Sequence, residues 1–259
     1  MPSKEREAPS RAAAEQLAEL IRESECTVAL SGAGISVPSG IPDFRTPGKG
    51  IWEKVDPMSV ATIDAFHRDT RRFWDFYRPR FHALSNKRPN PAHEALAELE
   101  RRGMLDAVIT QNIDLLHRKA GSKRVIEVHG SIATASCTSC DASFELERVE
   151  SLFDDEGIAT CTCCAGKVKP DVVLFGELLP ADAMEQAQEW CTRAELLLCV
   201  GSSLEVYPVA GLPELTLASG GRIAIITKSA TGYDSQAAVR LDGDVVRELE
   251  AVLAALNRA

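Results

Sequence analysis

CTVALSGAGIS, residues 26 to 36, decides the fold class of this chain. Its apolar run ends abruptly in a glycine-rich turn, which is the pattern of a buried strand that leads into a turn and then a helix. Three similar runs each follow a segment with helical character: AVIT (107–110), LLLCVG (196–201) and RIAIIT (222–227). Repeated strand and helix units of this kind predict an α/β fold with a parallel sheet.

Both ends of the chain carry predicted helices. Residues 1–11 are polar and are expected to be flexible, after which Ala14, Leu17 and Ile21 recur at helical spacing. The chain closes with VVRELEAVLAAL, an amphipathic pattern. Two regions interrupt the alternation of strands and helices: a stretch rich in Phe, Trp, Arg and Pro at 44–90, and a cysteine-bearing segment at 131–169. The length of 259 residues suits one large domain or one domain with a small insertion.

The composition is that of an ordinary globular protein, with 45% hydrophobic and 26% charged residues. The net charge of −9 argues against an electrostatic grip on nucleic acid, which needs clustered Lys and Arg. No apolar run is long enough to cross a bilayer, and the polar N-terminus lacks the apolar core of a secretory signal. We therefore expect a cytoplasmic protein that binds neither nucleic acid nor a membrane directly.

Eight cysteines in a chain without an export signal favour metal binding over a disulfide framework. The pairs Cys137-x-x-Cys140 and Cys161-x-x-Cys164 are separated by 20 residues. Four thiolates satisfy a tetrahedral zinc ion and leave no open position, so the spacing predicts one structural zinc ion. Cys163 is a competitor for the second pair, and a set of unligated thiols is the alternative interpretation.

Polar residues and glycines follow the predicted strands, at the edge where open α/β sheets bind ligands. SGAGIS can cradle a phosphate because glycines let the backbone approach it, although the motif is not GxGxxG and a plain turn is the alternative. Gln111, Asn112 and Asp114 follow the AVIT strand, where they can bind ribose and carboxamide groups. The alternative is that Asn112 and Asp114 cap a helix. His129 follows VIEV and is a candidate base near pH 7 or a structural histidine.

Taken in this order, the motifs resemble those of the sirtuin family, bacterial type. The matching strings are GAGIS-x-x-SGIPDFR, TQNID-x-LH, the HG pair, the two CxxC pairs, KPDVVLFGE and GSSLEVYP, over roughly residues 26 to 210. The resemblance implies a Rossmann-like parallel sheet with helices on both faces, a small zinc-binding module and a helical lobe. It assigns 12–130 and 170–257 to the large NAD-binding domain, with 44–90 as the helical lobe and cofactor loop, and 131–169 to the zinc module.

The resemblance also implies an activity and a set of site residues. Sirtuins transfer the acyl group of a modified protein lysine to the ADP-ribose part of NAD and release nicotinamide. His129 would be the general base, and Asn112 would bind ribose and position solvent. The remaining NAD contacts implied by the match are Gly32, Ala33, Gly34, Asp43, Phe44, Arg45, Gln111, Ile113, Asp114, Gly201, Ser202 and Ser203. The usual Asn after the RIAII strand is replaced by Thr227, which leaves the adenosine contacts open.

Family members bind acylated-lysine proteins as an extended peptide that adds as a strand between two loops. The matching substrate residues are Val173, Phe175, Gly176, Glu177 and Val206. Tyr77 and Arg80 resemble a pair found in sirtuins that remove succinyl or malonyl groups. Pro79 stands between them, which predicts a broken helix and a misaligned pair.

The leading hypothesis is thus an NAD-dependent protein-lysine deacylase, with acetyl as the expected acyl group and acidic acyl groups as a further option through Tyr77 and Arg80. One alternative keeps NAD consumption and makes ADP-ribose transfer to protein the main reaction. A zinc-ribbon binding module is the other alternative, and it explains only the cysteines. Nothing in the residues specifies the oligomeric state, for which a monomer is slightly favoured.

Overall fold

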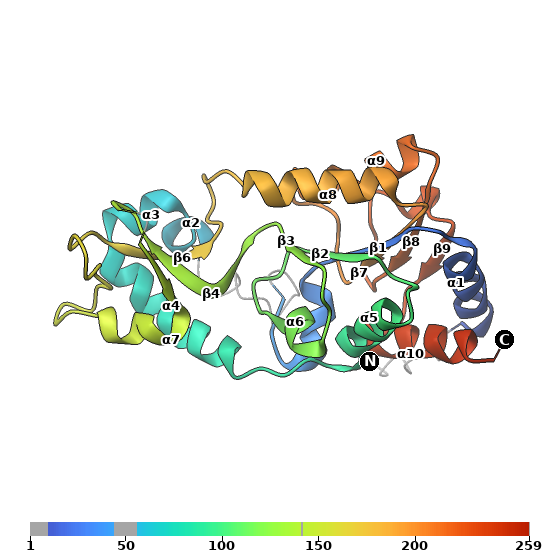
Figure 1. Ribbon diagram of the computed structural model, residues 1–259, viewed down its shortest axis with the longest axis horizontal. Coiled ribbons are helices and arrows are strands. Elements are labelled where there is room, and N and C mark those ends of the chain that lie inside the picture. The colour runs from blue at the N-terminus through green and yellow to red at the C-terminus, as the bar shows by residue number, and fades with distance from the viewer. Residues whose placement is uncertain (1–9, 44–55, 141, 259) are drawn as a thin grey trace, which may run out of the picture.

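The computed structural model describes residues 10–43, 56–140 and 142–258 (Figure 1). Its main element is a parallel sheet of six strands in the order β3-β2-β1-β7-β8-β9. The strands are β1 (Thr27–Ser31), β2 (Ala107–Thr110), β3 (Val125–Glu127), β7 (Leu196–Val200), β8 (Arg222–Ile226) and β9 (Val239–Leu241). The four apolar runs predicted to be strands are β1, β2, β7 and β8, so that prediction is confirmed.

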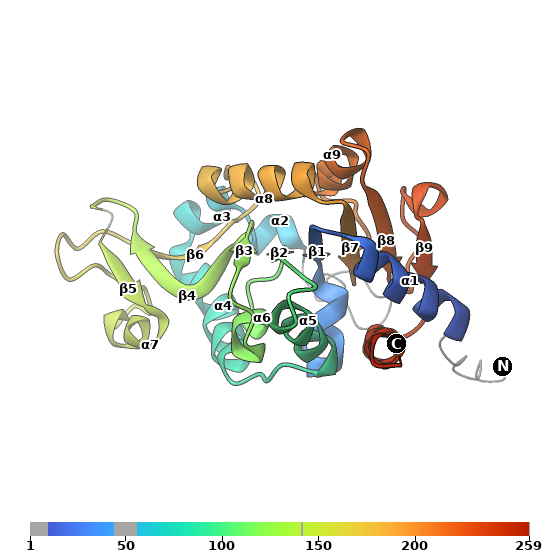
Figure 2. The same ribbon diagram turned by 45° about the vertical axis from the view of Figure 1, so that its right-hand side comes forward.

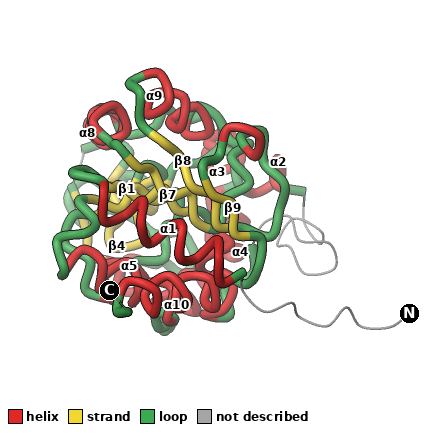
Figure 3. The backbone as a smooth tube through the Cα atoms, turned by 90° about the vertical axis from the view of Figure 1, so that its right-hand side faces the viewer, coloured by secondary structure: helices red, strands yellow, loops and turns green. Residues whose placement is uncertain are grey.

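Helices cover both faces of this sheet. Figure 3 shows the strands, in yellow, between two layers of helices, in red. The helices α1 (Arg11–Glu23), α5 (Pro91–Arg101) and α10 (Val245–Leu256) pack on one face, and α8 (Ala181–Arg193) and α9 (Leu212–Ala218) pack on the other. Alternate residues of β1 enter the two cores, since Ala29 belongs to one and Val28 and Leu30 to the other. All five residues of β1 are buried, as expected for a central parallel strand.

The described residues of the two regions that interrupt the alternation form a separate lobe, seen at the left of Figure 1. It contains an antiparallel sheet of three strands, β5 (Ser143–Glu145), β4 (Gly130–Cys137) and β6 (Val168–Val172). Its helical elements are α2 (Pro57–Val60), α3 (Ile63–Arg68), α4 (Thr70–Ser85), α7 (Leu146–Val149) and η3 (Glu150–Leu152). In Figure 2 the part of this lobe with β5 and α7 lies at the left, and α2, α3 and α4 lie nearer the middle. One hydrophobic cluster joins the helical and the cysteine-bearing parts, and the Trp74 indole donates to the carbonyl of Val168 at 3.2 Å.

Helix α4 continues through Pro79, so the predicted break does not occur. A proline in a helix removes one backbone hydrogen bond and displaces the carbonyl of the preceding turn. Phe73, Trp74 and Phe81 are buried on both sides of Pro79 and hold the two halves of α4 against the lobe's core. The Arg80 guanidinium donates to the carbonyl of Phe76 in the same turn. Tertiary packing therefore outweighs the local cost of the proline.

The glycine-rich turn leads into a 3₁₀ helix, η1 (Ala33–Ser39), rather than into a regular α-helix. Pro38 lies inside η1, and Gly40 ends it in the left-handed region with φ of 75°. The remaining short helices are α6 (Leu116–Ala120), η4 (Val209–Gly211) and η5 (Asp234–Gln236). Among the described residues, no helix is both long and apolar enough to cross a membrane.

We retain the division into a large domain (12–130 and 170–257), a zinc module (131–169) and a helical lobe (44–90) as a proposal. The small sheet begins at Gly130 and ends at Val172, so it reaches slightly beyond the expected limits of the zinc module. The packing of the helical lobe on the zinc module groups these two parts together. The predicted flexible N-terminus at 1–11 falls largely outside the described residues.

Candidate active site and zinc site

The candidate active site lies at the carboxyl edge of the six-stranded sheet. β1 pairs with β2 on one side and with β7 on the other. Starting from β1, the chain first adds β2 and β3 on one side and later adds β7, β8 and β9 on the other, so the direction of strand addition changes beside β1. Open α/β sheets bind ligands in the crevice at such a switch point. The chain leaves these strands at Gly32, Gln111 and Gly201, and His129 follows β3 on the same edge.

The turns after β1 and β7 are in direct backbone contact. The amide of Gly34 donates to the carbonyl of Gly201 at 2.8 Å, and the amide of Gly32 donates to Val200 at 3.0 Å. A Cβ atom on Gly34 would lie 2.7 Å from the Gly201 oxygen, and one on Gly201 would lie 2.3 Å from the Ile35 nitrogen. Both positions therefore require glycine, because the two turns approach each other more closely than a Cβ atom allows.

Two amide side chains connect the β2 edge to these turns. Gln111 Nε2 donates to Ser202 Oγ at 2.9 Å, and Asn112 Nδ2 donates to the carbonyl of Gly32 at 3.1 Å. The Asn112 amide also donates to Ser36 Oγ at 3.2 Å. Both side chains are only half-buried, so their remaining polar atoms are within reach of a ligand in the crevice. Neither amide caps a helix.

The hydroxyl of Ser36 is the centre of a buried hydrogen-bond network. Ser36 Oγ donates to Asp114 Oδ2 at 2.6 Å and accepts from Asn112. The other oxygen of Asp114 accepts from the backbone amide of Leu116 at 2.9 Å, so Asp114 supports the start of α6 as well as the site. Burial raises the pKa of Asp114, while the hydrogen bonds from Ser36 and Leu116 act in the opposite direction.

His93 completes the environment of Ser36. The backbone amide of Asn90 donates to His93 Nδ1 at 3.4 Å, so in the neutral ring Nε2 carries the hydrogen and points it at Ser36 Oγ, also at 3.4 Å. Burial lowers the pKa of His93 to about 4, which keeps the ring neutral at neutral pH. The two lone pairs of Ser36 Oγ thus accept hydrogens from Asn112 and His93, so the hydroxyl hydrogen of Ser36 points to Asp114.

His129 has a defined tautomer. Its Nδ1 lies 2.9 Å from the carbonyl oxygen of Gln111, and because a carbonyl only accepts, Nδ1 carries the hydrogen. The neutral ring then has its lone pair on Nε2. Burial lowers the pKa of His129, and the hydrogen bond to Gln111 partly offsets this effect. A neutral imidazole whose lone pair is on Nε2 is suited to accept a proton near pH 7.

The loop after β6 connects this histidine to the helical lobe. The amide of Val173 donates to the carbonyl of His129 at 2.9 Å. Further along, the amide of Phe175 donates to Ala61 at 2.9 Å and the carbonyl of Phe175 accepts from Ile63 at 3.1 Å. The Phe175 side chain is 50% exposed, which is unusual for a large apolar residue held on both sides of its backbone.

The other expected substrate residues lie on the same loop and on the loop after β7. Gly176 has φ of 91°, and Glu177 accepts from the amide of Leu174 at 2.8 Å and forms a 3.0 Å ion pair with Lys169. Val206 lies on the second loop and is 38% exposed. Each loop thus presents an exposed apolar side chain on a hydrogen-bonded backbone.

Tyr77 and Arg80 lie one turn apart on α4, and their surroundings differ. The Tyr77 ring stacks on Phe81 at 5.2 Å and contacts Phe73 at 4.5 Å, and burial raises the pKa of Tyr77 to about 12. The Arg80 guanidinium lies 3.5 Å above the ring of Phe76 and donates to the carbonyl of that residue. Arg80 is therefore engaged within its own helix.

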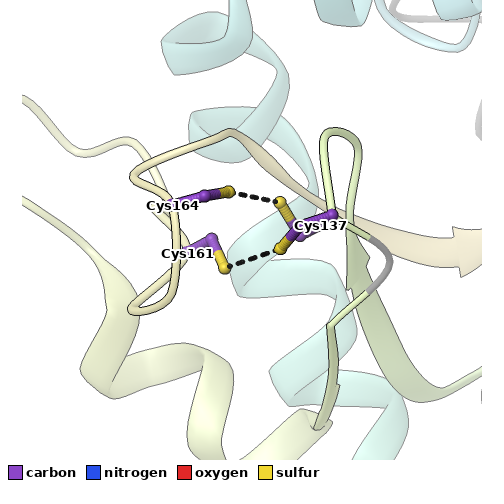
Figure 4. A group of neighbouring side chains, drawn as sticks. Cys137, Cys161 and Cys164 are labelled. Carbon is purple, nitrogen blue, oxygen red and sulfur yellow. Dashed lines mark hydrogen bonds between the residues drawn. The ribbon is translucent and has the colours of Figure 1, made fainter.

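The four predicted cysteines form one cluster in the lobe, and Figure 4 labels three of them, Cys137, Cys161 and Cys164. Their sulfur atoms all lie within 4.8 Å of one another, with 3.5 Å between Cys137 and Cys164 and 3.7 Å between Cys140 and Cys161. Four thiols at this spacing are positioned to bind one zinc ion. Cys163 is exposed and lies outside the cluster, although its backbone amide donates to Cys161 Sγ at 3.3 Å. The geometry therefore favours Cys161 with Cys164 as the second pair.

The structure brings most of the predicted NAD contacts to a single edge of the sheet. The turns after β1, β2 and β7 hold Gly32, Ala33, Gly34, Gln111, Asn112, Ile113, Asp114, Gly201, Ser202 and Ser203. Asp43 is the last described residue before the gap at 44–55, and Phe44 and Arg45 lie outside the described residues. Thr227 is buried, and its amide donates to Leu241 at 3.1 Å.

Comparison with known proteins agrees with this geometry. The profile of the Sir2 family matches residues 32–208. The chain belongs to the Sir2 family. An NAD-dependent protein deacetylase of Thermotoga maritima is 42% identical over 228 residues, which cover 88% of this chain and 92% of the relative. An NAD-dependent protein deacylase of Thermococcus sibiricus is 39% identical over 247 residues, with 94% and 96% covered.

Solved structures give the same result. A substituted Sir2 protein with a deacetylated p53 peptide and 3′-O-acetyl ADP ribose superimposes with a TM-score of 0.88 at 40% identity, covering 93% of this chain and 97% of that one. The fold of this Sir2-family chain is thus shared over nearly its whole length, including the lobe that carries the four cysteines.

Sequence reasoning did not single out two residues that the structure places at the centre of this Sir2-family site. Ser36 is part of the quoted GAGIS string, and His93 follows the capping asparagine Asn90 of α5. A buried His at the third position of a helix gives little signal in a single sequence, because such residues are more often structural. Only the contact between the segments, 57 residues apart, reveals their joint role.

Proposed function

We propose that this protein is an NAD-dependent protein-lysine deacylase that transfers the acyl group to ADP-ribose and releases nicotinamide. The observation that carries the proposal is the fixed tautomer of His129, whose Nε2 lone pair lies at the edge where the turns after β1, β2 and β7 meet. The names of the Sir2-family relatives and the contents of the solved complex support the same activity.

In this proposal, the chain's own residues bind, orient and move protons. Gly34 and Gly201 keep the phosphate turn free of side chains, while Ser36 and His93 orient the Asp114 carboxylate toward the carboxamide of nicotinamide. NAD supplies the ribose carbon that the acyl oxygen attacks as nicotinamide leaves. Because that oxygen is a weak nucleophile, the main contribution of the site is to hold the two groups in position.

His129 then acts on the ribose hydroxyl. Its Nε2 takes the proton of this hydroxyl, whose oxygen attacks the acyl-derived carbon, and the later steps release free lysine and O-acyl-ADP-ribose. The Gln111 carbonyl stabilises the imidazolium that forms, since it accepts from Nδ1 in both protonation states. Asn112 is the second catalytic residue in the proposal, where it binds ribose and positions solvent.

Acylated-lysine proteins would bind as an extended strand between the loops after β6 and β7. Val173, Phe175, Gly176 and Glu177 border one side, and Val206 borders the other. The backbone of Phe175 is already paired with Ala61 and Ile63 in a strand-like manner, which makes this loop a stable edge for a further strand.

The proposed activity is tested by its products. Purified protein is incubated with NAD and acetylated, propionylated and succinylated versions of one peptide, and the products are identified by mass. We expect free nicotinamide, deacylated peptide and O-acyl-ADP-ribose in equal amounts. Transfer of labelled ADP-ribose to protein, without O-acyl-ADP-ribose, would instead support the ADP-ribosyltransferase alternative. Absence of NAD binding would favour the zinc-ribbon module.

For the acyl group, we infer that acetyl is preferred. An acidic acyl group would need the Arg80 guanidinium, which now contacts the ring and carbonyl of Phe76, and the Tyr77 hydroxyl, whose ring is stacked between Phe73 and Phe81. Turning Arg80 toward a ligand would break its contacts with the ring and the carbonyl of Phe76. Acidic-acyl removal is kept as the second candidate because the i, i+3 spacing places the two residues on one side of α4.

Arg80→Met is expected to change deacetylation and desuccinylation by the same factor, within about threefold, because no charged acyl contact is lost. The measurement is kcat/KM on acetylated and succinylated forms of one peptide. The matched control for helix stability is Arg78→Met. Arg78 lies on α4 like Arg80, and the substitution removes its ion pair with Glu150 of η3. A selective loss of roughly tenfold or more on the succinylated peptide would establish the acidic-acyl candidate, since charge-assisted hydrogen bonds contribute about 1.5–3 kcal/mol.

A further inference from the structure

Lys169 lies on β6, and its ammonium group is bonded to the end of that strand and to the loop that follows. The three hydrogens of the ammonium have three acceptors. They are the carbonyl of Pro170 at 3.0 Å, the carbonyl of Val172 at 2.8 Å and Glu177 Oε2, with which Lys169 forms an ion pair of 3.0 Å. The Lys169 side chain is only 15% exposed. Because lysine is rarely buried unless it is paired, this pairing holds the side chain in one place.

The loop after β6 makes a tight turn over residues 174–177. The amide of Glu177 donates to the carbonyl of Leu174 at 3.0 Å, and Gly176 has the positive φ that such a turn needs at its third position. The carboxylate of Glu177 closes the turn a second time, because Oε2 accepts from the amide of Leu174 at 2.8 Å. The same oxygen forms the ion pair with Lys169. Lys169 and Glu177 thus tie the turn to the end of β6.

This tie lies between the proposed base and the border of the proposed peptide groove. Lys169 donates to the carbonyl of Val172, and the amide of the next residue, Val173, donates to the carbonyl of His129. At the other end of the loop, Lys169 meets Glu177. The backbone from 173 to 177, which would pair with the peptide, is therefore fixed at both ends by one ammonium group.

We propose that Lys169 is a positioning residue for the peptide-binding loop, which sets the affinity for the acylated peptide through Glu177. This inference rests on the proposed function and deepens it. A peptide that adds as a strand needs a border whose backbone is already in place, and a loop that is in place only part of the time binds more weakly by that fraction. Without Lys169, the Glu177 carboxylate, which is 23% exposed, would lose its cation and the turn would lose its tie.

The test replaces Lys169 by methionine, which keeps an apolar stem and removes the ammonium. A fluorescently labelled acetylated peptide is titrated with the protein to obtain Kd, and the kinetics are measured in parallel. We expect Kd and KM for the peptide to rise by roughly tenfold or more, the effect of losing a charge-assisted hydrogen bond. Both kcat and KM for NAD should change by less than about twofold, because the tie does not reach the turns after β1, β2 and β7. Lys169→Arg keeps the charge and should recover part of the affinity.

Two further variants separate the tie from a general loss of charge. Lys167→Met makes the same change two residues earlier, where the ammonium donates to the carbonyl of His67 at 3.1 Å, and it should leave the peptide Kd unchanged. Glu177→Gln keeps an acceptor for the amide of Leu174 and loses the ion pair, so the peptide Kd should rise by a smaller factor. Added to Lys169→Met, it should have little further effect, because the two residues act through one contact.

An unchanged peptide Kd in Lys169→Met would overturn the inference alone. So would a fall in kcat or zinc content at an unchanged peptide Kd, since that result would give Lys169 a purely structural role. If Lys169→Met does not fold, Glu177→Gln decides, and an unchanged peptide Kd in that variant overturns the inference. If the unmodified protein neither binds nor deacylates the acetylated peptide, the proposed function is contradicted and the inference with it.

Discussion

Replacement of His129 by alanine is expected to lower kcat/KM by roughly 10²- to 10⁴-fold, the range for loss of a positioned general base. The variant should still fold and bind zinc, because the side chain is only half-buried and lies in the loop between β3 and β4 rather than in the zinc cluster. Its Nδ1 hydrogen bond to Gln111 contributes a modest amount to stability, about 1 kcal/mol. Activity on the acetylated peptide, zinc content and the unfolding midpoint together check this prediction.

The pH dependence gives an independent check on the same residue. A base must be unprotonated, and burial holds the pKa of His129 below its ordinary value of 6.5. Activity should therefore persist at pH 6.5 and decline only as the pH falls further, through the pKa of the folded protein. The residual activity of His129→Ala should no longer show this decline at low pH.

A matched control is His82→Ala, which removes an exposed histidine from α4. It should leave kcat/KM and its pH profile unchanged. Near-normal turnover by purified His129→Ala would rule out the assignment of this residue as the base. A loss of turnover accompanied by loss of zinc or a lowered unfolding midpoint would show that His129 acts through structure.

Cys161→Ala is expected to abolish zinc binding and to lower the unfolding midpoint by roughly 10 °C or more, because metal binding and folding are coupled at structural zinc sites. Cys161 is buried in the cluster, and its sulfur also accepts the backbone amide of Cys163. The lobe's hydrophobic core includes Cys137 and Cys161 themselves, so loss of the metal should also loosen the helices packed on it. Zinc content by mass spectrometry and thermal unfolding measure the two effects.

Cys163→Ala provides a control within the same motif. Its side chain is exposed and takes no part in the cluster, and its backbone amide remains after the substitution. We expect one zinc ion per chain and an unchanged midpoint. If Cys163→Ala lost the metal while Cys161→Ala retained it, the assignment of the second pair would be reversed.

Much of the sheet could be predicted from local patterns. The apolar runs at 107–110, 196–201 and 222–227 are all strands, because a strand buried on both faces needs a continuous apolar sequence. The four zinc-binding cysteines were also identified by spacing alone, since a two-residue spacer places two sulfurs of one turn near one ion. The roles of His129, Asn112 and the NAD contacts, in contrast, came from family resemblance and stay proposals.

Other features depend on contacts between distant residues. The sequence suggested a helix broken at Pro79, but Phe73 and Phe81 pack in the lobe's core and keep α4 continuous. Likewise, the helical stretch and the cysteine segment looked like two separate interruptions, whereas Trp74 and Val168 join them in one lobe. The local sequence does not distinguish Ser36 or His93 from a structural residue, because their contact joins segments that are far apart in the chain.

The sequence by itself determined the alternation of strands and helices along the chain, the glycine turn after β1 and the two CxxC pairs, because each follows from residues within a few positions of one another. It left open whether Cys163 competes with the second pair. Only the tertiary structure decided the tautomer of His129, the direction of the Ser36 hydrogen and the engagement of Arg80 with Phe76. The physical reason is that a hydrogen bond's direction and a side chain's burial depend on the atoms that surround it in space. For Ser36 and His129, those atoms come from several segments that are far apart along the chain.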